Sequence, residues 1–326
     1  MRHLTITLES WPLAKTFTIS RGSKSSAEVV VATVFDGDGA GRGECVPYTR
    51  YGESVEGVAA ALRALAPDIA AGMNREALQR ILPAGAARNA LDCALWDLEA
   101  KTQGTTVWKL AGLPKPGPVT TAYTLGLDNA VAMGRAARAE SHRPLLKMKL
   151  AGEGDLERVA AVRKAAPNCR LIVDANEGWT AEMVAPFSAA LAGLGVEMIE
   201  QPLPAGADGI LAELPHAVPI YADESCHDRA SLDSIVGKYD GINIKLDKTG
   251  GLTEALALKQ AAEAAGLKIM VGCMVATSLA VAPAMLLAQG AAIADLDGAL
   301  LLARDRDHGL EFAESELFPP CVALWG

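Results

Sequence analysis

Short apolar runs recur at a nearly constant interval through the last two thirds of this 326-residue chain, and each run ends in polar residues. The eight runs end at positions 124, 149, 174, 200, 223, 245, 273 and 295, so successive ends are separated by 25, 25, 26, 23, 22, 28 and 22 residues. This interval accommodates one strand and one helix, and eight such units predict a (β/α)8-type barrel. The units are not similar to one another in sequence, which excludes a solenoid repeat.

The residues ahead of the barrel have a different pattern. Alternating or β-branched segments predict strands at 3–9, 16–20, 28–35 and 41–45, with a hairpin turn at 36–39. Helices are expected to follow, because Ser54 is typical of an N-cap and residues 88–103 carry apolar side chains at helical spacing before Gly104. Strands followed by helices predict an α+β domain over residues 1–115.

A proline-rich stretch at 113–118 separates the two patterns and is typical of a linker. The barrel domain is therefore expected to span residues 116–303. The residues after Ala303, about 304–326, contain no ninth unit and are expected to return to the first domain.

Charge and composition exclude several kinds of partner. The net charge of −9 argues against nucleic acid or an anionic membrane as a partner, because both bind basic surfaces. No apolar stretch approaches the roughly 20 residues that a membrane helix needs, and the N-terminal residues have no signal-peptide core. The six cysteines form no C-x-x-C pair, which favours a reducing compartment and a cytoplasmic location.

Three carboxylates end consecutive strands of the predicted barrel, where all strands deliver their last residues to one pocket. Asp174, Glu200 and Asp223 end the third, fourth and fifth strands. Converging carboxylates repel one another unless a cation neutralises them, and ligation by oxygen alone suits Mg²⁺. No histidine or cysteine joins the set, so zinc is disfavoured. Such a metal would accept a substrate carboxylate and stabilise the charge that forms when an α-proton leaves.

Lysines flank this predicted metal site. Lys147 and Lys149 point the same way, because side chains alternate along a strand, and each is expected to make the other easier to deprotonate. Lys149 ends the second strand and Lys245 the sixth, so they are expected to face each other across the pocket. Two opposed lysines beside a metal-bound carboxylate are what a 1,1-proton transfer requires.

Other residues at the strand ends carry weaker signals. Asp295 and Asp297 end the eighth strand, opposite the fourth, and are expected to hold a cationic group away from the metal. Asn176 is expected to support the site rather than ligate the metal, and Cys273 by itself is more typical of a small core residue. The run from Arg21 to Lys24 fits a solvated loop as well as a functional one.

The order and spacing of K-x-K, D-x-N, E-Q-P, D-E-S and a late lysine resemble the enolase superfamily, specifically its muconate-lactonizing subgroup. That superfamily uses a lysine or histidine base with Mg²⁺. Segments 84–92, 243–251 and 294–298 resemble the L-Ala-D/L-Glu dipeptide epimerases of that subgroup.

The resemblance implies a modified (β/α)7β barrel under an α+β capping domain, with residues 304–326 completing the cap. It implies one Mg²⁺ on Asp174, Glu200 and Asp223, with Lys149 and Lys245 as the S-face and R-face acid/base residues. It also implies the contacts with the substrate. Lys147 would bind the substrate carboxylate, and Asp295 and Asp297 the dipeptide α-ammonium. Thr124 and Cys273 would make further contacts, and Arg21 would bind the glutamate side chain, with Lys24 as the alternative cation.

The expected activity is therefore cytoplasmic epimerisation of L-Ala-D-Glu and L-Ala-L-Glu, with a role in recycling murein peptides; a homo-oligomer is compatible with the sequence. The alternatives are cycloisomerisation or o-succinylbenzoate synthesis, whose substrates lack the ammonium that Asp295 and Asp297 would bind, or epimerisation of other dipeptides. A non-catalytic metal- or peptide-binding protein would have no use for both Lys149 and Lys245.

Overall fold

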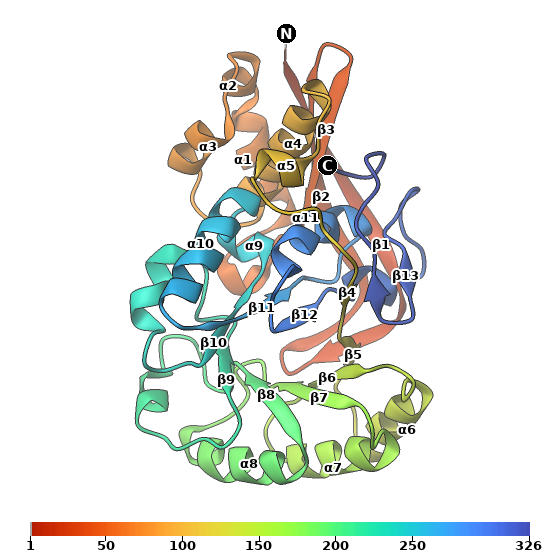
Figure 1. The fold of residues 1–326 in the computed structure, drawn as a ribbon, viewed down its shortest axis with the longest axis vertical. Helices are drawn as coiled ribbons and strands as arrows, with labels where there is room; N and C mark the ends of the chain where they lie inside the picture. Colours follow the sequence, from red (N-terminus) through yellow and green to blue (C-terminus); the bar gives the residue numbers. More distant parts are fainter. Residues whose placement is uncertain (1) are drawn as a thin grey trace.

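The computed structural model describes residues 2–326, so Met1, the first residue of the expected cap, lies outside the described residues. The chain forms a capping region of three antiparallel strands with helices, an eight-stranded parallel barrel, and a short three-stranded sheet made with the tail (Figure 1). The predicted enolase-like architecture is confirmed.

The cap is built on β1 (His3–Ile19), β2 (Gly22–Asp36) and β3 (Gly39–Cys45). The predicted turn is present, since Asp36 pairs with Gly39. The sequence predicted two separate strands before residue 21 and a loop after it. Instead, β1 and β2 form one long hairpin whose register shifts between Pro12 and Phe17 and resumes up to the pair Ile19–Gly22. The hairpin reaches down to the barrel, where Leu127 N donates to Thr18 O at 2.9 Å.

The helices of the cap lie against one face of this sheet. They are η1 (Thr49–Tyr51), α1 (Val55–Ala64), α2 (Ala66–Ala70), α3 (Arg75–Ile81), α4 (Ala86–Thr102) and α5 (Val107–Leu110). Ser54 caps α1 as predicted, accepting from Gly57 N at 3.1 Å. The backbone of α4 approaches β3 so closely that a Cβ on Gly41 would lie 2.2 Å from Ala94 O and one on Gly43 2.1 Å from Ala90 O. These two glycines therefore permit α4 to pack on the sheet.

The barrel strands end where the apolar runs predicted. They are β5 (Tyr123–Leu125), β6 (Leu145–Lys149), β7 (Arg170–Asp174), β8 (Val196–Glu200), β9 (Ile220–Ala222), β10 (Gly241–Ile244), β11 (Lys268–Gly272) and β12 (Ile293–Asp295). Neighbours along the chain pair in parallel in unbroken order. A parallel bridge between Thr121 and Ala294 joins the two ends of the sheet and closes the ring.

The connections between strands are mostly helical. They contain α6 (Ala130–Ala139), α7 (Asp155–Ala165), α8 (Ala181–Gly193), η2 (Gly209–Ala212), η3 (Arg229–Ser234), α9 (Leu246–Thr249), α10 (Leu252–Ala264) and α11 (Ser278–Ala288). The connections after β8 and β9 contain only the 3-10 helices η2 and η3. After β12 comes the short η4 (Gly298–Leu301), so the eighth unit lacks its helix, as the resemblance implied.

The C-terminal tail contacts both parts of the molecule. Its hairpin of β13 (Phe312–Ala313) and β14 (Glu316–Leu317) pairs with β4 (Val119–Thr120) at the entry to the barrel. The last residues pack on α4, where Trp325 Nε1 donates to Cys93 O at 3.0 Å and Gly326 N donates to Asp97 Oδ1 at 2.8 Å.

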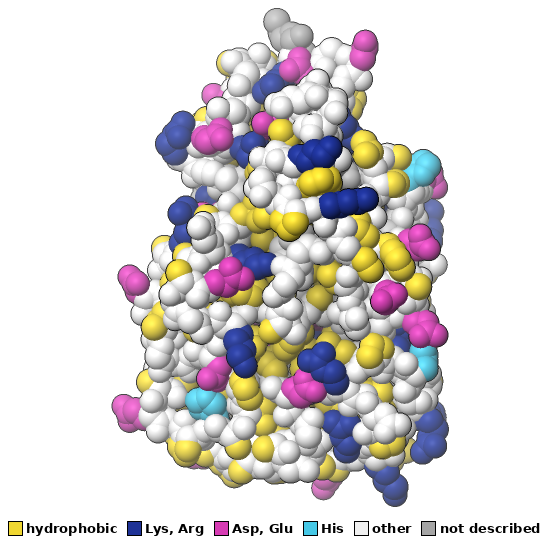
Figure 2. Space-filling view, viewed as in Figure 1, with side chains coloured by type: hydrophobic (Ala, Val, Ile, Leu, Met, Phe, Trp, Pro, Cys, Tyr) yellow, Lys and Arg dark blue, Asp and Glu magenta, His cyan; other side chains and the backbone are white. Residues whose placement is uncertain are grey.

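On the face shown in Figure 2, basic and acidic side chains are interspersed, without a continuous basic area. No helix within residues 2–326 combines the length and apolar character needed to cross a membrane.

Candidate active site

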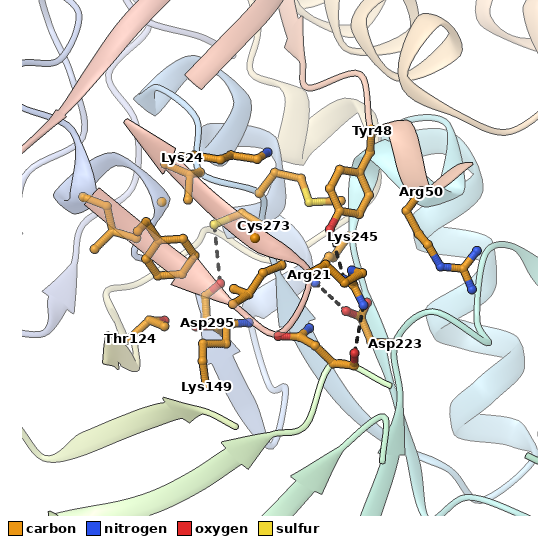
Figure 3. A pocket seen from close by; sticks show the side chains of 18 of the residues that line it. Arg21, Lys24, Tyr48, Arg50, Thr124, Lys149, Asp223, Lys245, Cys273 and Asp295 are labelled. Carbon is orange, nitrogen blue, oxygen red and sulfur yellow. Dashed lines mark hydrogen bonds and ion pairs between the residues drawn. The ribbon is translucent and has the colours of Figure 1, made fainter. Parts of the chain in front are cut away.

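A cavity of about 390 Å³ opens at the carboxyl ends of the barrel strands, beneath the tip of the β1–β2 hairpin (Figure 3). The strand ends supply most of its charged groups, and the hairpin and the segment around η1 supply Arg21, Lys24, Tyr48 and Arg50. The site is thus assembled from both parts of the molecule.

The predicted metal ligands converge. Asp174, Glu200 and Asp223 are buried, and one oxygen from each lies within 4.8 Å of the others. Asn243 Nδ2 donates to Glu200 Oε1 at 2.6 Å, and Asn176 donates to Asp174 from its backbone at 2.8 Å and its side chain at 3.1 Å. Three buried oxygen donors this close fit one hard divalent cation such as Mg²⁺.

The pKa values of the three carboxyls diverge because they share one buried site. Burial and the charge of Asp174 raise the pKa of Glu200. Burial also opposes ionisation of Asp174 and Asp223, but nearby lysines outweigh it and hold both pKa values below their usual range. A cation between the three carboxyls would remove the mutual repulsion.

Three lysines contact this carboxylate cluster. Lys149 Nζ lies 2.6 Å from Asp174 Oδ2, and Lys245 Nζ lies 2.7 Å from Asp223 Oδ2. Lys147 Nζ lies 2.6 Å from Glu200 Oε2. The two lysines proposed as bases therefore approach the cluster from strands four apart in the ring, each beside a different carboxylate.

The expected easing of lysine deprotonation by the lysine pair is not what the protein's own groups produce. Burial alone lowers the pKa of Lys147 and Lys245, but the surrounding carboxylates outweigh it and hold both pKa values well above the usual range. A divalent cation bound at these carboxylates, as the sequence predicts, would offset part of their effect on both lysines.

The two aspartates of the last strand have different surroundings. Asp297 Oδ2 accepts from Thr124 N at 2.6 Å, and burial, with Asp295 nearby, raises the pKa of Asp297 to about 7. Asp295 Oδ2 lies 2.6 Å from Lys147 Nζ, which also contacts Glu200. Asp295 thus lies on the strand opposite that of Glu200, and the long Lys147 side chain bridges the two carboxylates.

The hairpin tip places two cations at the cavity rim. Both Nη atoms of Arg21 are bonded: Nη2 donates to Glu224 Oε1 at 2.7 Å and Tyr48 OH at 3.0 Å, and Nη1 donates to the Asn176 carbonyl at 3.0 Å and to Glu177 Oε2 at 3.2 Å. Lys24 makes no ion pair with any group in residues 2–326, and its Nζ lies 5.3 Å from the Tyr48 ring centre. Its pKa is lowered because neighbouring protein reduces its hydration and Arg21 repels it.

Thr124 and Cys273 also line the cavity. Burial, with Asp297 and Asp295 nearby, raises the pKa of the Cys273 thiol, so this cysteine is neutral at pH 7. The structure therefore places it as a wall of the site, without the thiolate that a nucleophile requires.

Sequence reasoning missed several residues that organise the site. Lys248 Nζ donates to Asp223 O at 2.5 Å and to Asp223 Oδ1 at 2.6 Å. Gln201 Oε1 accepts from Asp223 N at 2.9 Å, and Glu224 holds Arg21. The signals were present, since Lys248 lies one helical turn after Lys245 and the other two belong to the E-Q-P and D-E-S motifs.

Comparison with known proteins agrees with this geometry. The N-terminal domain model of the mandelate racemase/muconate lactonizing enzyme family matches residues 1–112, and the enolase C-terminal domain-like model matches residues 116–315. An L-Ala-D/L-Glu epimerase from Escherichia coli (strain K12) is 48% identical over 319 residues, which cover 97% of this chain and 99% of the relative. An N-acetyl-D-glutamate racemase from Pseudoalteromonas sp. is 43% identical over 300 residues, covering 91% and 95%.

Solved structures show the same fold with ligands bound. An enolase family member from Agrobacterium tumefaciens with homology to dipeptide epimerases, bound to sodium and L-Ala-L-Glu, is 51% identical with a TM-score of 0.98 over 100% of both chains. A dipeptide epimerase from Enterococcus faecalis V583, complexed with Mg and L-Leu-L-Tyr, is 30% identical with a TM-score of 0.91, covering 97% of this chain and 96% of that one. The predicted single-metal site is confirmed by the carboxylate cluster and these metal-bound relatives. Together, the two domain matches and the epimerase and racemase relatives place this chain in the mandelate racemase/muconate lactonizing enzyme family of the enolase superfamily.

Proposed function

We propose that this protein is a magnesium-dependent dipeptide epimerase that inverts the α-carbon of the C-terminal residue and interconverts L-Ala-D-Glu and L-Ala-L-Glu. One observation carries the proposal: Lys149 and Lys245 stand beside different members of one carboxylate cluster, on strands four apart in the ring. Two bases around one metal site are what inversion at a carbon requires.

Asp174, Glu200 and Asp223 would hold the Mg²⁺, and the dipeptide carboxylate would bind beside it, next to Lys147. The ion supplies positive charge near that carboxylate when the α-carbon loses its proton. Lys147 adds a second positive charge there from within the barrel.

The proton transfer balances without any further reactant. One lysine, as the neutral amine, takes the α-proton; the C–H electron pair remains with the substrate and is delocalised into its carboxylate. The other lysine, as the ammonium, delivers a proton to the opposite face and forms the new C–H bond. The family pattern assigns Lys149 to the S face and Lys245 to the R face, and the reverse reaction exchanges their roles.

The ends of the dipeptide would be recognised separately. Asp295 and Asp297 are both buried; burial, and then repulsion by Asp295, raises the pKa of Asp297, and a substrate ammonium between the two carboxylates would relieve that repulsion. Thr124 and Cys273 would contact the peptide. For the glutamate side chain we favour Lys24, because the guanidinium of Arg21 is already bonded to Glu224 and Tyr48.

The 43% identical racemase raises a second candidate, racemisation of an N-acylated glutamate. Such a substrate offers the same two carboxylates and the same α-proton but has no ammonium. The paired Asp295 and Asp297 support the dipeptide instead.

The cellular setting is part of the same proposal. A cytoplasmic enzyme acting on L-Ala-D-Glu would recycle murein peptides. Residues 1–115, completed by residues 304–326, would form the cap over the barrel of residues 116–303. The protein would act on its small-molecule dipeptide as a monomer or as a homo-oligomer.

The test is deuterium incorporation at the α-carbon of glutamate in D₂O with Mg²⁺, comparing L-Ala-L-Glu with N-acetyl-L-glutamate. The dipeptide should exchange and epimerise with a kcat/KM at least about 10-fold higher, given the charge-assisted bonds of the ammonium. A higher value for N-acetylglutamate would select the second candidate, and exchange of neither would contradict both.

A further inference from the structure

The segment that carries Lys245 is held from the other domain. Lys245 follows β10 directly and is the N-cap of α9, a helix of four residues. A single helical turn is not stable by itself, so its position depends on what it contacts. Lys248 ties α9 to Asp223 and Asn243 of the barrel, and Val46 N, just after β3 of the cap, donates to Asp247 Oδ1 at 3.0 Å. Further contacts come from α4 of the cap, from the part of the chain that resembled the epimerases in sequence.

Arg88 binds the end of α9. Its Nη2 donates to Thr249 O at 2.7 Å and its Nε to Gly250 O at 3.1 Å. The last carbonyls of a helix have no partner within the helix, and a buried arginine supplies the missing donors as well as a positive charge at the negative end.

Asn89 and Asp92, also on α4, contact α9 and the start of α10. Asn89 Nδ2 donates to Asp247 Oδ1 at 2.9 Å, within α9 itself. Asp92 accepts from Thr253 N at 2.9 Å and from Thr253 Oγ1 at 2.6 Å, in the first turn of α10. All three side chains are buried, so these bonds form away from solvent.

The glycine pair after α9 is fitted to this contact. A Cβ on Gly250 would lie 2.4 Å from Arg88 Nε, and one on Gly251 would lie 2.5 Å from Asp92 Cβ. Both glycines also have positive φ, at 73° and 107°. The close approach of α4 therefore requires glycine at both positions.

Lys149 has a different kind of support. It is the last residue of β6, paired in register with Asp174 of β7, and the next amide, Leu150 N, donates to Asp174 O at 2.9 Å. These contacts lie within the barrel. The cap thus adds to the support of Lys245, while these contacts of Lys149 lie within the barrel sheet.

We propose that Arg88, Asn89 and Asp92 are positioning residues that hold Lys245 in place from the capping domain. This inference rests on the proposed function, because it gives Lys245 one of the two proton transfers. It explains why the cap helix carries R-N-x-x-D opposite the T-G-G segment of the barrel. Its consequence is that damage to this contact affects the two faces of the substrate unequally.

The variants are Asp92→Asn, which keeps the shape of the side chain, and Arg88→Gln. The matched control is Asp97→Asn, because Asp97 is a buried aspartate on the same helix whose partners are Arg42 N, Lys101 Nζ and Gly326 N. Early α-proton exchange of each epimer is measured in D₂O at saturating Mg²⁺, and Lys245→Ala identifies the exchange that depends on Lys245. Lys248 of α9 donates to Asp223, a proposed metal ligand, so a displaced α9 would also weaken metal binding. Saturating Mg²⁺ keeps this effect out of the comparison.

We expect the Lys245-dependent exchange to fall about 10- to 100-fold in both variants, since a small misplacement of a reacting group has that effect, while the Lys149-dependent exchange stays within about 2-fold. Asp97→Asn should leave the ratio of the two exchanges unchanged. Equal losses on both faces, or no loss, would overturn the positioning role.

Backbone amide exchange of residues 246–251, followed by mass spectrometry, gives an independent readout. It should be faster in Asp92→Asn and Arg88→Gln than in Asp97→Asn, and equal rates would overturn the proposal. If the wild-type protein exchanged no α-proton, the proposed function would fail and the catalytic part of this inference with it, while the amide rates would still decide whether α4 holds α9.

Discussion

At the scale of single residues, the two cations of the hairpin tip differ in their availability. Arg21 already bonds Glu224, Tyr48 and Asn176, whereas Lys24 faces the cavity with a lowered pKa. Sequence reasoning left the choice between them open, because neither the turn at residues 20–22 nor the partner Glu224 is evident from the hairpin sequence alone.

Lys24→Met should raise KM for L-Ala-L-Glu about 3- to 10-fold with a smaller effect on kcat, because the contact is remote from the α-carbon and lies at an exposed rim. L-Ala-L-Met should be unaffected or improved. Steady-state kinetics with both dipeptides measures this. If Lys24→Met left the ratio of the kcat/KM values for the two dipeptides unchanged, recognition of the glutamate side chain would be assigned to Arg21.

Asp297→Asn should lower kcat/KM for the dipeptide about 10- to 100-fold, because a charge-assisted bond to the ammonium is lost. The amide oxygen can still accept from Thr124 N, so the melting temperature should change little. N-acetylglutamate should gain relative to the dipeptide. A variant that kept wild-type kcat/KM for L-Ala-L-Glu would remove Asp297 from substrate recognition.

The barrel residues that the sequence identified share one property: they lie at or just beyond strand ends, where a period of two and an interval of about 25 residues place them. The roles of Lys248 and Gln201 were not predicted, because they depend on the direction of a side chain after the strand has ended. Asn176 and Gln201 have φ of 45° and 34°, a left-handed backbone that no strand pattern predicts. The raised pKa values of Lys147 and Lys245 were not predicted for a related reason, since they depend on which acidic side chains converge in space.

At the scale of elements, the cap and barrel are joined by a buried ion cluster. Arg306 of the tail donates to Glu9 Oε2 at 2.6 Å and to Glu44 Oε2 at 2.6 Å, and Glu44 also accepts from Thr277 at the start of α11. Burial raises the pKa of Glu44, although Arg306 opposes this. The cluster therefore depends on its one arginine.

Arg306→Met should lower the free energy of unfolding by about 3–5 kcal/mol at pH 7, because the buried Glu44 would lose its cationic partner. At pH 5, Arg306→Met should lower the free energy of unfolding by less than at pH 7. Removing Arg306 raises the pKa of Glu44 further, so protonation at lower pH relieves the uncompensated charge. Urea unfolding at the two pH values measures both effects.

The control is Arg170→Met, which removes an exposed pair with Glu197 whose Nη2–Oε2 distance is 2.7 Å. It should change stability by less than about 1 kcal/mol at either pH. A loss in Arg306→Met no larger than in this control would contradict the assigned role of the cluster.

The barrel strands were the most predictable part of the fold, because they are short buried runs, mostly apolar, that recur at a nearly constant interval. The connections after β8 and β9 were not predictable in detail, since η2 and η3 are too short to show a helical period. The long β1–β2 hairpin was missed because Pro12 interrupts the alternation, although pairing resumes beyond the irregularity.

At the scale of the whole molecule, metal should couple to stability as well as activity. Chelator-treated protein should be inactive and regain activity with Mg²⁺. Mg²⁺ at about 100 times its Kd should also stabilise the fold by about 2.7 kcal/mol. Glu200→Gln should lose most of both effects. Full activity after verified removal of metal would contradict the assigned cluster.

Both domains are needed to complete the site, since the barrel supplies the carboxylates and lysines while the cap supplies the hairpin tip and the support of α9. The central claim about this assembly is that two lysines act on opposite faces of one carbon. It is tested most directly by α-proton exchange of each epimer in D₂O with Lys149→Ala and Lys245→Ala. We expect neither variant to epimerise, each to lose exchange of a different epimer by at least about 10²-fold, and each to retain exchange of the other. Epimerisation at the wild-type rate by either variant, or loss of the same epimer's exchange in both, would contradict the two-base account.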